Sequence, residues 1–140
     1  MSETGKTKDA GYQAGVRKTF AITAQETWEF LFSKEGLKIW LGDFNPAELT
    51  IERPITTALC DLKLTTFRQG SHLRMQWRKK QWTNTSILQM RIIPSGQKTT
   101  ISFHQEKLAD IAQRQEMIEH WQSVLSELNY RFRENNLFTN

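Results

Sequence analysis

The sequence has little cysteine, proline and glycine. Its 140 residues include one cysteine, three prolines and seven glycines. Cys60 has no second cysteine to pair with, and a lone thiol favours a reducing compartment, so we expect a cytoplasmic protein. No apolar run approaches the roughly 20 residues that a membrane-spanning helix requires, which predicts a soluble chain. A chain of this length can bury enough surface to fold without a metal or a disulfide framework.

The chain also has little net charge, and its positive excess is concentrated in one segment. In total, 19 basic and 15 acidic side chains give a formal charge of +4. Residues 58–97 hold seven basic side chains and one acidic one, whereas residues 1–57 and 98–140 each hold one more acidic side chain than basic. The middle segment is therefore either a docking surface or a solvated face.

Hydrophobic periodicity predicts an α+β domain. The polar composition of residues 1–14 predicts a flexible tail, and residues 15–140 are expected to form one domain. The predicted elements, in order, are a strand over 16–22, short helices over 26–32 and 34–41, an edge strand with a loop over 44–57, four antiparallel strands ending near 104, and a long helix over 109–134. This order predicts a curved antiparallel sheet wrapped around the long C-terminal helix.

Several stretches of the sequence resemble one known family. They are residues 24–31, 37–41, 70–77 and 93–103, with His120-Trp121 in the place of the family's Gly-Trp. In this order they resemble the helix-grip fold of the START-like superfamily, also called SRPBCC or Bet v 1-like. Within it, they are similar to the bacterial subgroup related to the C-terminal domain of the activator of the 90-kDa heat-shock protein ATPase. The resemblance implies a cavity between the sheet and the long helix, and a chaperone-associated role in the stress response.

A set of mainly apolar side chains is predicted to face this cavity. The candidate ligand-binding residues are Trp40, Leu64, Met75, Trp77, Met90, Phe103, His120, Trp121 and Leu125. Aromatic residues at structural spacing usually form a core, so two interpretations stay open: a filled core, or the lining of a pocket for an apolar or aromatic small molecule, lipid-like or a metabolite. His120 flanks the apolar stripe of the long helix and is the first polar candidate for contact with a ligand.

The sequence offers little sign of catalysis. It has no Gly-x-Ser-x-Gly motif, and Cys60 is predicted to be a small core residue. His72, His104 and His120 lie on separate elements without metal-ligand spacing, so no metal or cofactor is expected. We therefore expect a non-enzymatic binding domain; a cyclase or dehydratase, as in some members of the superfamily, stays a further alternative.

Four basic side chains are predicted to lie on the outer face of the sheet. Strand alternation directs Lys63, Arg74, Arg78 and Arg91 away from the apolar positions. They indicate either a solvated face or a contact with an acidic protein partner such as a chaperone. Nucleic acid is disfavoured because no aromatic residues interleave with the cations. Trp82 lies in a polar connection and is expected to be exposed.

Overall fold

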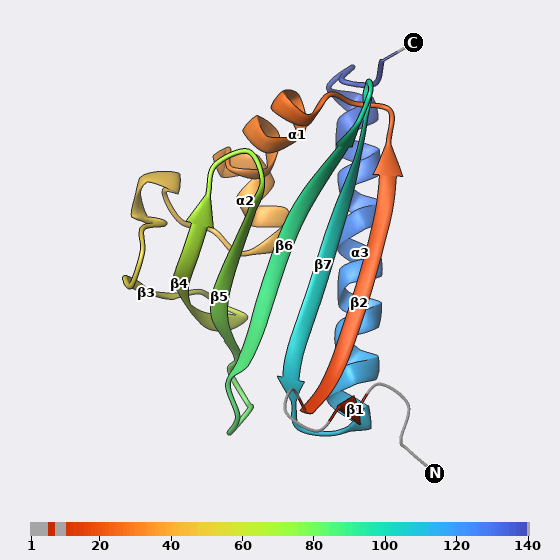
Figure 1. The fold of residues 1–140 in the computed structure, drawn as a ribbon. Helices are drawn as coiled ribbons and strands as arrows, with labels where there is room; N and C mark the ends of the chain where they lie inside the picture. Colours follow the sequence, from red (N-terminus) through yellow and green to blue (C-terminus); the bar gives the residue numbers. More distant parts are fainter. Residues whose placement is uncertain (1–5, 8–10, 140) are drawn as a thin grey trace.

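The computed structural model describes residues 6–7 and 11–139 of the chain (Figure 1). The strands are β1 (Lys6–Thr7), β2 (Gly11–Phe20), β3 (Pro54–Thr56), β4 (Cys60–Arg68), β5 (His72–Lys79), β6 (Ser86–Ser95) and β7 (Lys98–Leu108). The helices are α1 (Ala24–Leu31), α2 (Lys34–Trp40), the 3-10 helix η1 (Pro46–Glu48) and α3 (Ile111–Glu134). Two short helices follow the long strand β2, and one long helix ends the fold, as predicted.

The strands form one antiparallel sheet with the order β1-β2-β7-β6-β5-β4-β3. Strands β4 to β7 pair consecutively, which confirms the predicted meander. The proline-containing strand β3 pairs only with β4 and lies at an edge, as expected for a residue that cannot donate to a ladder. Gly70 and Gly96 have φ angles of 77° and 62° in the β4–β5 and β6–β7 hairpins, a conformation that favours glycine.

Local sequence explains where the helices begin. The side chains of Thr23, Ser33 and Asp110 accept hydrogen bonds from backbone N–H groups in the first turns of α1, α2 and α3. Between α1 and α2 the chains approach so closely that a Cβ at Gly36 would lie 1.8 Å from the carbonyl oxygen of Phe30. Glycine at this position therefore allows α2 to pack against the end of α1.

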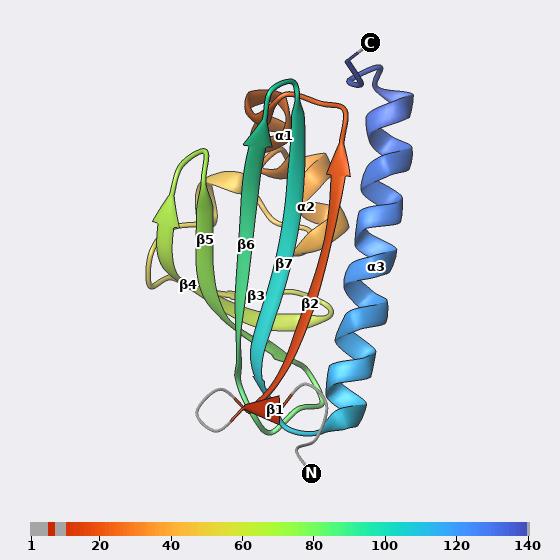
Figure 2. The ribbon, with the colours of Figure 1, turned by 45° about the vertical axis from the view of Figure 1, so that its right-hand side comes forward.

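All three α-helices lie on one face of the curved sheet. Figures 1 and 2 show α3 running along the length of the sheet beside β2 and β7, with α1 and α2 next to its C-terminal half. Phe20, Phe30 and Phe132 show how the layers meet, because the ring of Phe132 on α3 makes edge-to-face contacts with Phe20 on β2 and Phe30 on α1. The predicted α+β helix-grip fold is confirmed. Among the described residues, no helix is both long and apolar enough to cross a membrane.

Two sequence-based expectations need correction. Residues 11–14, expected in the tail, belong to β2, where Tyr12 and Ala14 are buried; the alternation of small residues in this stretch was too weak a signal. Residues 1–5 and 8–10 of the expected tail lie outside the described part of the chain. Trp82 is not exposed: its ring lies 5.5 Å from that of Trp77, and Arg78 Nη1 donates a 2.8 Å hydrogen bond to its carbonyl oxygen.

Candidate functional site

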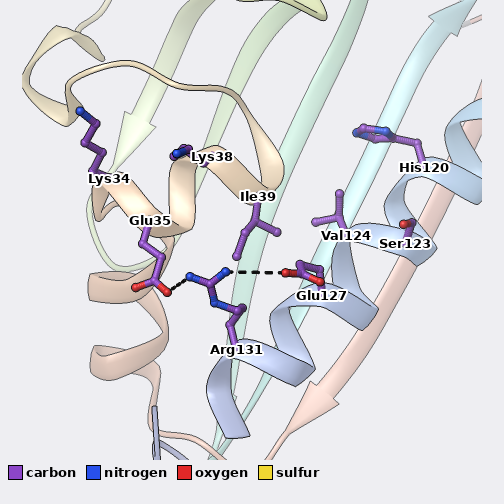
Figure 3. A pocket seen from close by; sticks show the side chains of 9 residues that line it. All are labelled: Lys34, Glu35, Lys38, Ile39, His120, Ser123, Val124, Glu127 and Arg131. Carbon is purple, nitrogen blue, oxygen red and sulfur yellow. Dashed lines mark hydrogen bonds and ion pairs between the residues drawn. The ribbon is translucent and has the colours of Figure 1, made fainter. Parts of the chain in front are cut away.

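A cleft lies between α2 and α3. Its volume is about 750 Å³, and side chains from both helices line it (Figure 3). The lining residues are Lys34, Glu35, Lys38 and Ile39 from α2, and His120, Ser123, Val124, Glu127 and Arg131 from α3. Because α1 and α2 are joined only by Phe32 and Ser33, the position of this wall depends on the tight α1–α2 packing at Gly36.

A second cleft continues from the first around the C-terminal end of α2. It has a volume of about 480 Å³ and reaches residues 56–59, in the connection between β3 and β4. Lys38, Ile39 and His120 line both clefts, so we call the two together the α2 cleft. Both volumes fall within the range of typical small-molecule sites.

Two buried nitrogen atoms lack hydrogen-bond partners beside this cleft. They are His120 Nε2 and Trp77 Nε1, and they are the buried side-chain nitrogen or oxygen atoms of the described residues that make no hydrogen bond. The two rings are neighbours, with centroids 6.2 Å apart. Buried polar atoms are nearly always paired in folded proteins, so each exception calls for an explanation, and a functional role is one of them. The pair therefore identifies the inner end of the α2 cleft as the candidate site.

Other buried polar groups in the same region are fully paired. Trp121 Nε1 donates to Gln105 Oε1 at 2.8 Å, and Gln105 Nε2 donates to Ser86 Oγ at 2.8 Å. Ser86 Oγ in turn donates to the carbonyl oxygen of Trp77 at 2.6 Å. Trp40 Nε1 also has a partner, the carbonyl oxygen of Leu31. The missing partners at Trp77 and His120 are thus a local property of the site.

The electrostatics of the cleft favour a neutral His120. Burial lowers the pKa of His120; nearby Glu116 acts in the opposite direction, and Lys79 adds to the lowering. A neutral imidazole has one N–H donor and one nitrogen acceptor, whereas the indole of Trp77 can only donate. The two nitrogens together suit a ligand oxygen that accepts one hydrogen bond and takes part in a second, such as a hydroxyl or carbonyl oxygen.

Charged side chains form the outer wall of the cleft. Arg131 forms ion pairs with Glu35 across the cleft and with Glu127 on its own helix, the latter at 3.8 Å (Figure 3). Lys34 and Lys38 are exposed and make no ion pair with any residue that the structure describes. The cleft therefore has a charged, solvated rim, and Ile39 and Val124 supply apolar lining.

The sequence-predicted ligand residues separate into two groups. Trp40 and His120 line the α2 cleft. The others are buried in the core without lining it: Leu64, Met75, Trp77, Met90, Phe103, Trp121 and Leu125. Phe103 and Trp121 stack with ring centroids 4.3 Å apart, so part of the predicted lining packs against itself.

The predicted basic face is largely compensated by acidic side chains. Arg74 pairs with Glu106 at 3.1 Å, and Lys63 pairs with Glu52 at 3.4 Å. Asp61 accepts hydrogen bonds from both Lys80 and Arg78. The hydrogen bonds from Lys80 and Thr56, together with the charges of Lys80 and Arg78, hold the pKa of the Asp61 carboxyl below its usual value. Of the four cations predicted to bind a partner, Arg91 alone has no carboxylate partner among the residues described.

The remaining chemical candidates, Cys60, His72 and His104, lie outside the α2 cleft. Cys60 is fully buried, and burial raises the pKa of its thiol, as expected for an inert core residue. His104 makes a 2.8 Å hydrogen bond with Gln13, and His72 makes one of the same length with Ser71. No group of three or more potential metal ligands occurs within the described part of the chain.

Sequence patterns missed most of the α2 cleft. Lys34, Glu35 and Lys38 lie on a short helix whose apolar spacing indicates only which side is buried. Residues 56–59 lie in a connection with no periodicity. The cleft depends on the angle at which α2 leaves α1, and the one local signal for that angle is Gly36.

Comparisons with known proteins connect this fold to solved structures. No family model and no curated protein matches the sequence. DynU16, from the dynemicin biosynthetic locus, superposes with a TM-score of 0.76 at 13% identity over 89% of this chain; the chain spans only 48% of DynU16. CalU16 from Micromonospora echinospora gives 0.73 at 14% identity, covering 86% of this chain and 74% of that one.

A further neighbour is relevant to the resemblance seen in the sequence. Aha1 from Colwellia psychrerythraea, solved in solution as a dimer, superposes with a TM-score of 0.65 at 12% identity, covering 84% of this chain and 92% of its own. Identities this low establish a shared fold and no shared activity. The chain therefore shares the helix-grip fold of these structures.

Proposed function

We propose that this protein binds an apolar or aromatic small molecule with a hydroxyl or carbonyl oxygen in the α2 cleft. The unpaired buried nitrogens, His120 Nε2 and Trp77 Nε1, carry the proposal. Each unpaired buried polar group costs about 1–3 kcal/mol, and a ligand that pairs with both recovers this free energy on binding. The SRPBCC fold supports the proposal, because helix-grip domains commonly enclose a cavity beside the long helix.

Binding requires a small movement of His120. Both nitrogens are buried, and His120 lies on the cleft side, since its ring lines the cleft and that of Trp77 does not. Turning the imidazole brings Nε2 into the cleft and uncovers Trp77 Nε1. The apolar part of the ligand then lies against Ile39 and Val124, which face each other across the cleft (Figure 3). The hydroxyl or carbonyl oxygen of the ligand then supplies the hydrogen-bond partner that His120 Nε2 and Trp77 Nε1 lack.

A matched pair of probes tests this proposal. We would titrate the protein with 2-naphthol and with naphthalene, which differ by one hydroxyl group, and follow binding by isothermal calorimetry. We expect 2-naphthol to bind at least about fivefold more tightly, because a hydrogen bond to a buried donor is worth roughly 1 kcal/mol or more. Absence of binding, or equal affinity for the two probes, contradicts the proposal.

Variants locate the site. His120→Phe and Trp77→Phe keep an aromatic ring and remove one nitrogen each, so both should reduce the preference for 2-naphthol. Trp28→Phe is the matched control, because Trp28 packs against Phe32 and Phe67 and lines neither part of the α2 cleft. A crystal structure grown with 2-naphthol in which a water molecule bridges the two nitrogens would exclude the ligand role.

A second candidate function is that of a chaperone-associated interaction module. The sequence resemblance to the heat-shock ATPase activator subgroup and the fold shared with Aha1 favour it. The test is the ATPase rate of purified 90-kDa heat-shock chaperone with and without this protein. An activator would raise the rate in proportion to the fraction of chaperone bound, and an unchanged rate at saturating protein would exclude the role.

A further inference from the structure

The outer face of the sheet carries a row of cationic side chains. Strand register places Arg68 opposite His72, His72 opposite Arg91, Arg91 opposite Ser102, and Ser102 opposite Arg17. We call Arg17, Arg68, His72 and Arg91 the cationic row. It crosses five neighbouring strands near the end of the sheet that carries the β4–β5 and β6–β7 hairpins, the upper end in Figure 1. With strands about 4.8 Å apart, the row is about 19 Å long.

The cationic row differs from the rest of this face because it lacks acidic partners. Further along the same strands, Lys63, Arg74 and Arg78 each pair with a carboxylate. Arg17, Arg68 and Arg91 make no ion pair with any residue whose position the structure describes. The positive charge of the middle segment is therefore cancelled on one part of the face and remains on the row.

The members of the row repel one another. Burial, Arg91 and Arg68 together lower the pKa of His72, which lies between the two arginines. His72 Nδ1 is engaged in a 2.8 Å hydrogen bond with Ser71 Oγ, which leaves Nε2 for an external partner. An anion bound on the row would relieve this repulsion.

The surroundings of the row indicate the kind of anion. The outward positions of β2 and β4 to β7 hold no phenylalanine, tyrosine or tryptophan on which a nucleic-acid base could stack. Ile93, two residues beyond Arg91 on the same face, leaves 40% of its surface exposed and offers an apolar contact. A length of about 19 Å corresponds to roughly six residues of extended chain. We propose that the cationic row binds an extended acidic segment of a partner protein.

Binding of a defined peptide tests this proposal. The probe is an acetylated, amidated octaglutamate peptide, with octaglutamine as the uncharged control, measured by calorimetry in about 0.05 and 0.2 M salt. We expect octaglutamate to bind and octaglutamine not to bind, and we expect octaglutamate to bind more weakly at the higher salt concentration.

The double variant Arg68→Gln/Arg91→Gln should lose roughly tenfold or more in affinity, because it removes two charge contacts. The matched control Lys63→Gln/Arg74→Gln changes the net charge equally but removes cations that already have partners, so its affinity should change less than about threefold.

A proton NMR titration of His72 gives an independent readout. Its pKa should rise when octaglutamate binds, and it should rise in free Arg68→Gln/Arg91→Gln, because both arginines lower it. Equal loss of affinity in the two double variants would overturn the proposal, since net charge alone would then explain binding. Tighter binding of a single-stranded oligonucleotide, or equal binding of inorganic phosphate, would also overturn it. Retained 2-naphthol binding by both variants would separate the row from the α2 cleft.

Discussion

Two neighbouring parts of the protein interior differ in whether their buried polar side chains form hydrogen bonds. In one, Trp121, Gln105 and Ser86 form a continuous chain of hydrogen bonds that ends on the carbonyl oxygen of Trp77. In the other, the side-chain nitrogens of Trp77 and His120 have no partner. Trp77 belongs to both parts, since its backbone is paired and its indole nitrogen is not.

This difference distinguishes buried polar groups that stabilise the fold from buried polar groups that are left for a ligand. Gln105 comes from β7, Ser86 from β6 and Trp121 from α3, so the paired chain joins the long helix to two strands and fixes their relative position. The unpaired nitrogens contribute nothing comparable and cost free energy in the unbound protein. Stability experiments should therefore distinguish the two tryptophans, although both are almost fully buried.

The largest expected effect comes from comparing Trp121→Phe with Trp77→Phe. Both remove similar volume from the core, but Trp121→Phe also leaves Gln105 Oε1 without its donor. We expect Trp121→Phe to lower the free energy of unfolding by about 1–3 kcal/mol more than Trp77→Phe. Urea denaturation of both variants at neutral pH measures the difference. Equal losses would mean that the hydrogen bond of Trp121 has no special structural role.

Gln105→Leu tests the same chain from its centre. The substitution nearly preserves side-chain volume and leaves the Trp121 N–H without an acceptor, so a loss of about 1–3 kcal/mol is expected. Combining it with Trp121→Phe removes both partners, so the double variant should lose less than the sum of the single losses. A double-mutant cycle in urea measures this coupling, expected at roughly 0.5–3 kcal/mol. Strictly additive losses would contradict the paired network.

The sequence could predict the fold because the relevant signals are local and repeated. Alternation in β4 to β7 and helical spacing in α3 identified the meander and the long helix. Buried Met75, Met90 and Phe103 were correctly placed on the inner face. Residues 11–14 were misassigned because Gly11 and Ala14 give almost no alternation signal, although Ala14 is buried.

The candidate site could be predicted only in part. His120 was identified because it flanks the apolar stripe of α3, and Trp77 because it alternates with polar neighbours. Their lack of hydrogen-bond partners depends on distances between β5 and α3, which no sequence pattern contains. Likewise, alternation placed Arg74 and Arg91 on the same face but could not show that Glu106 pairs with Arg74 alone.

A smaller effect is expected from the titration of His120. Burial lowers its pKa in the folded protein, so as the pH falls the unfolded chain takes up a proton before the folded one does. Its contribution to stability is therefore present above the unfolded pKa of about 6.5 and decreases as the pH falls through the folded pKa. Between about pH 7.5 and 5.5, wild-type protein should lose more stability than His120→Gln. The other titrating groups, His72 and Asp61 among them, are common to both proteins and cancel in the comparison. If the free energy of unfolding changed with pH in the same way in both proteins, His120 would not be a buried neutral group.

The smallest effect should come from Arg131→Met at the rim of the cleft, which represents a third kind of polar group. Arg131 pairs with Glu35 and Glu127, but all three side chains are partly exposed, so solvent already satisfies them when the pairs break. Methionine retains most of the apolar stem, and we expect a loss of at most about 1 kcal/mol. Urea denaturation at low and high salt measures it, and salt should reduce the difference between variant and wild type. A loss well above this range would mean that the ion pairs hold α2 against α3. A small loss of stability would mean that the position of α2 depends on its packing at Gly36, where a Cβ would meet the Phe30 carbonyl oxygen. The charged rim would then be free to open around a ligand.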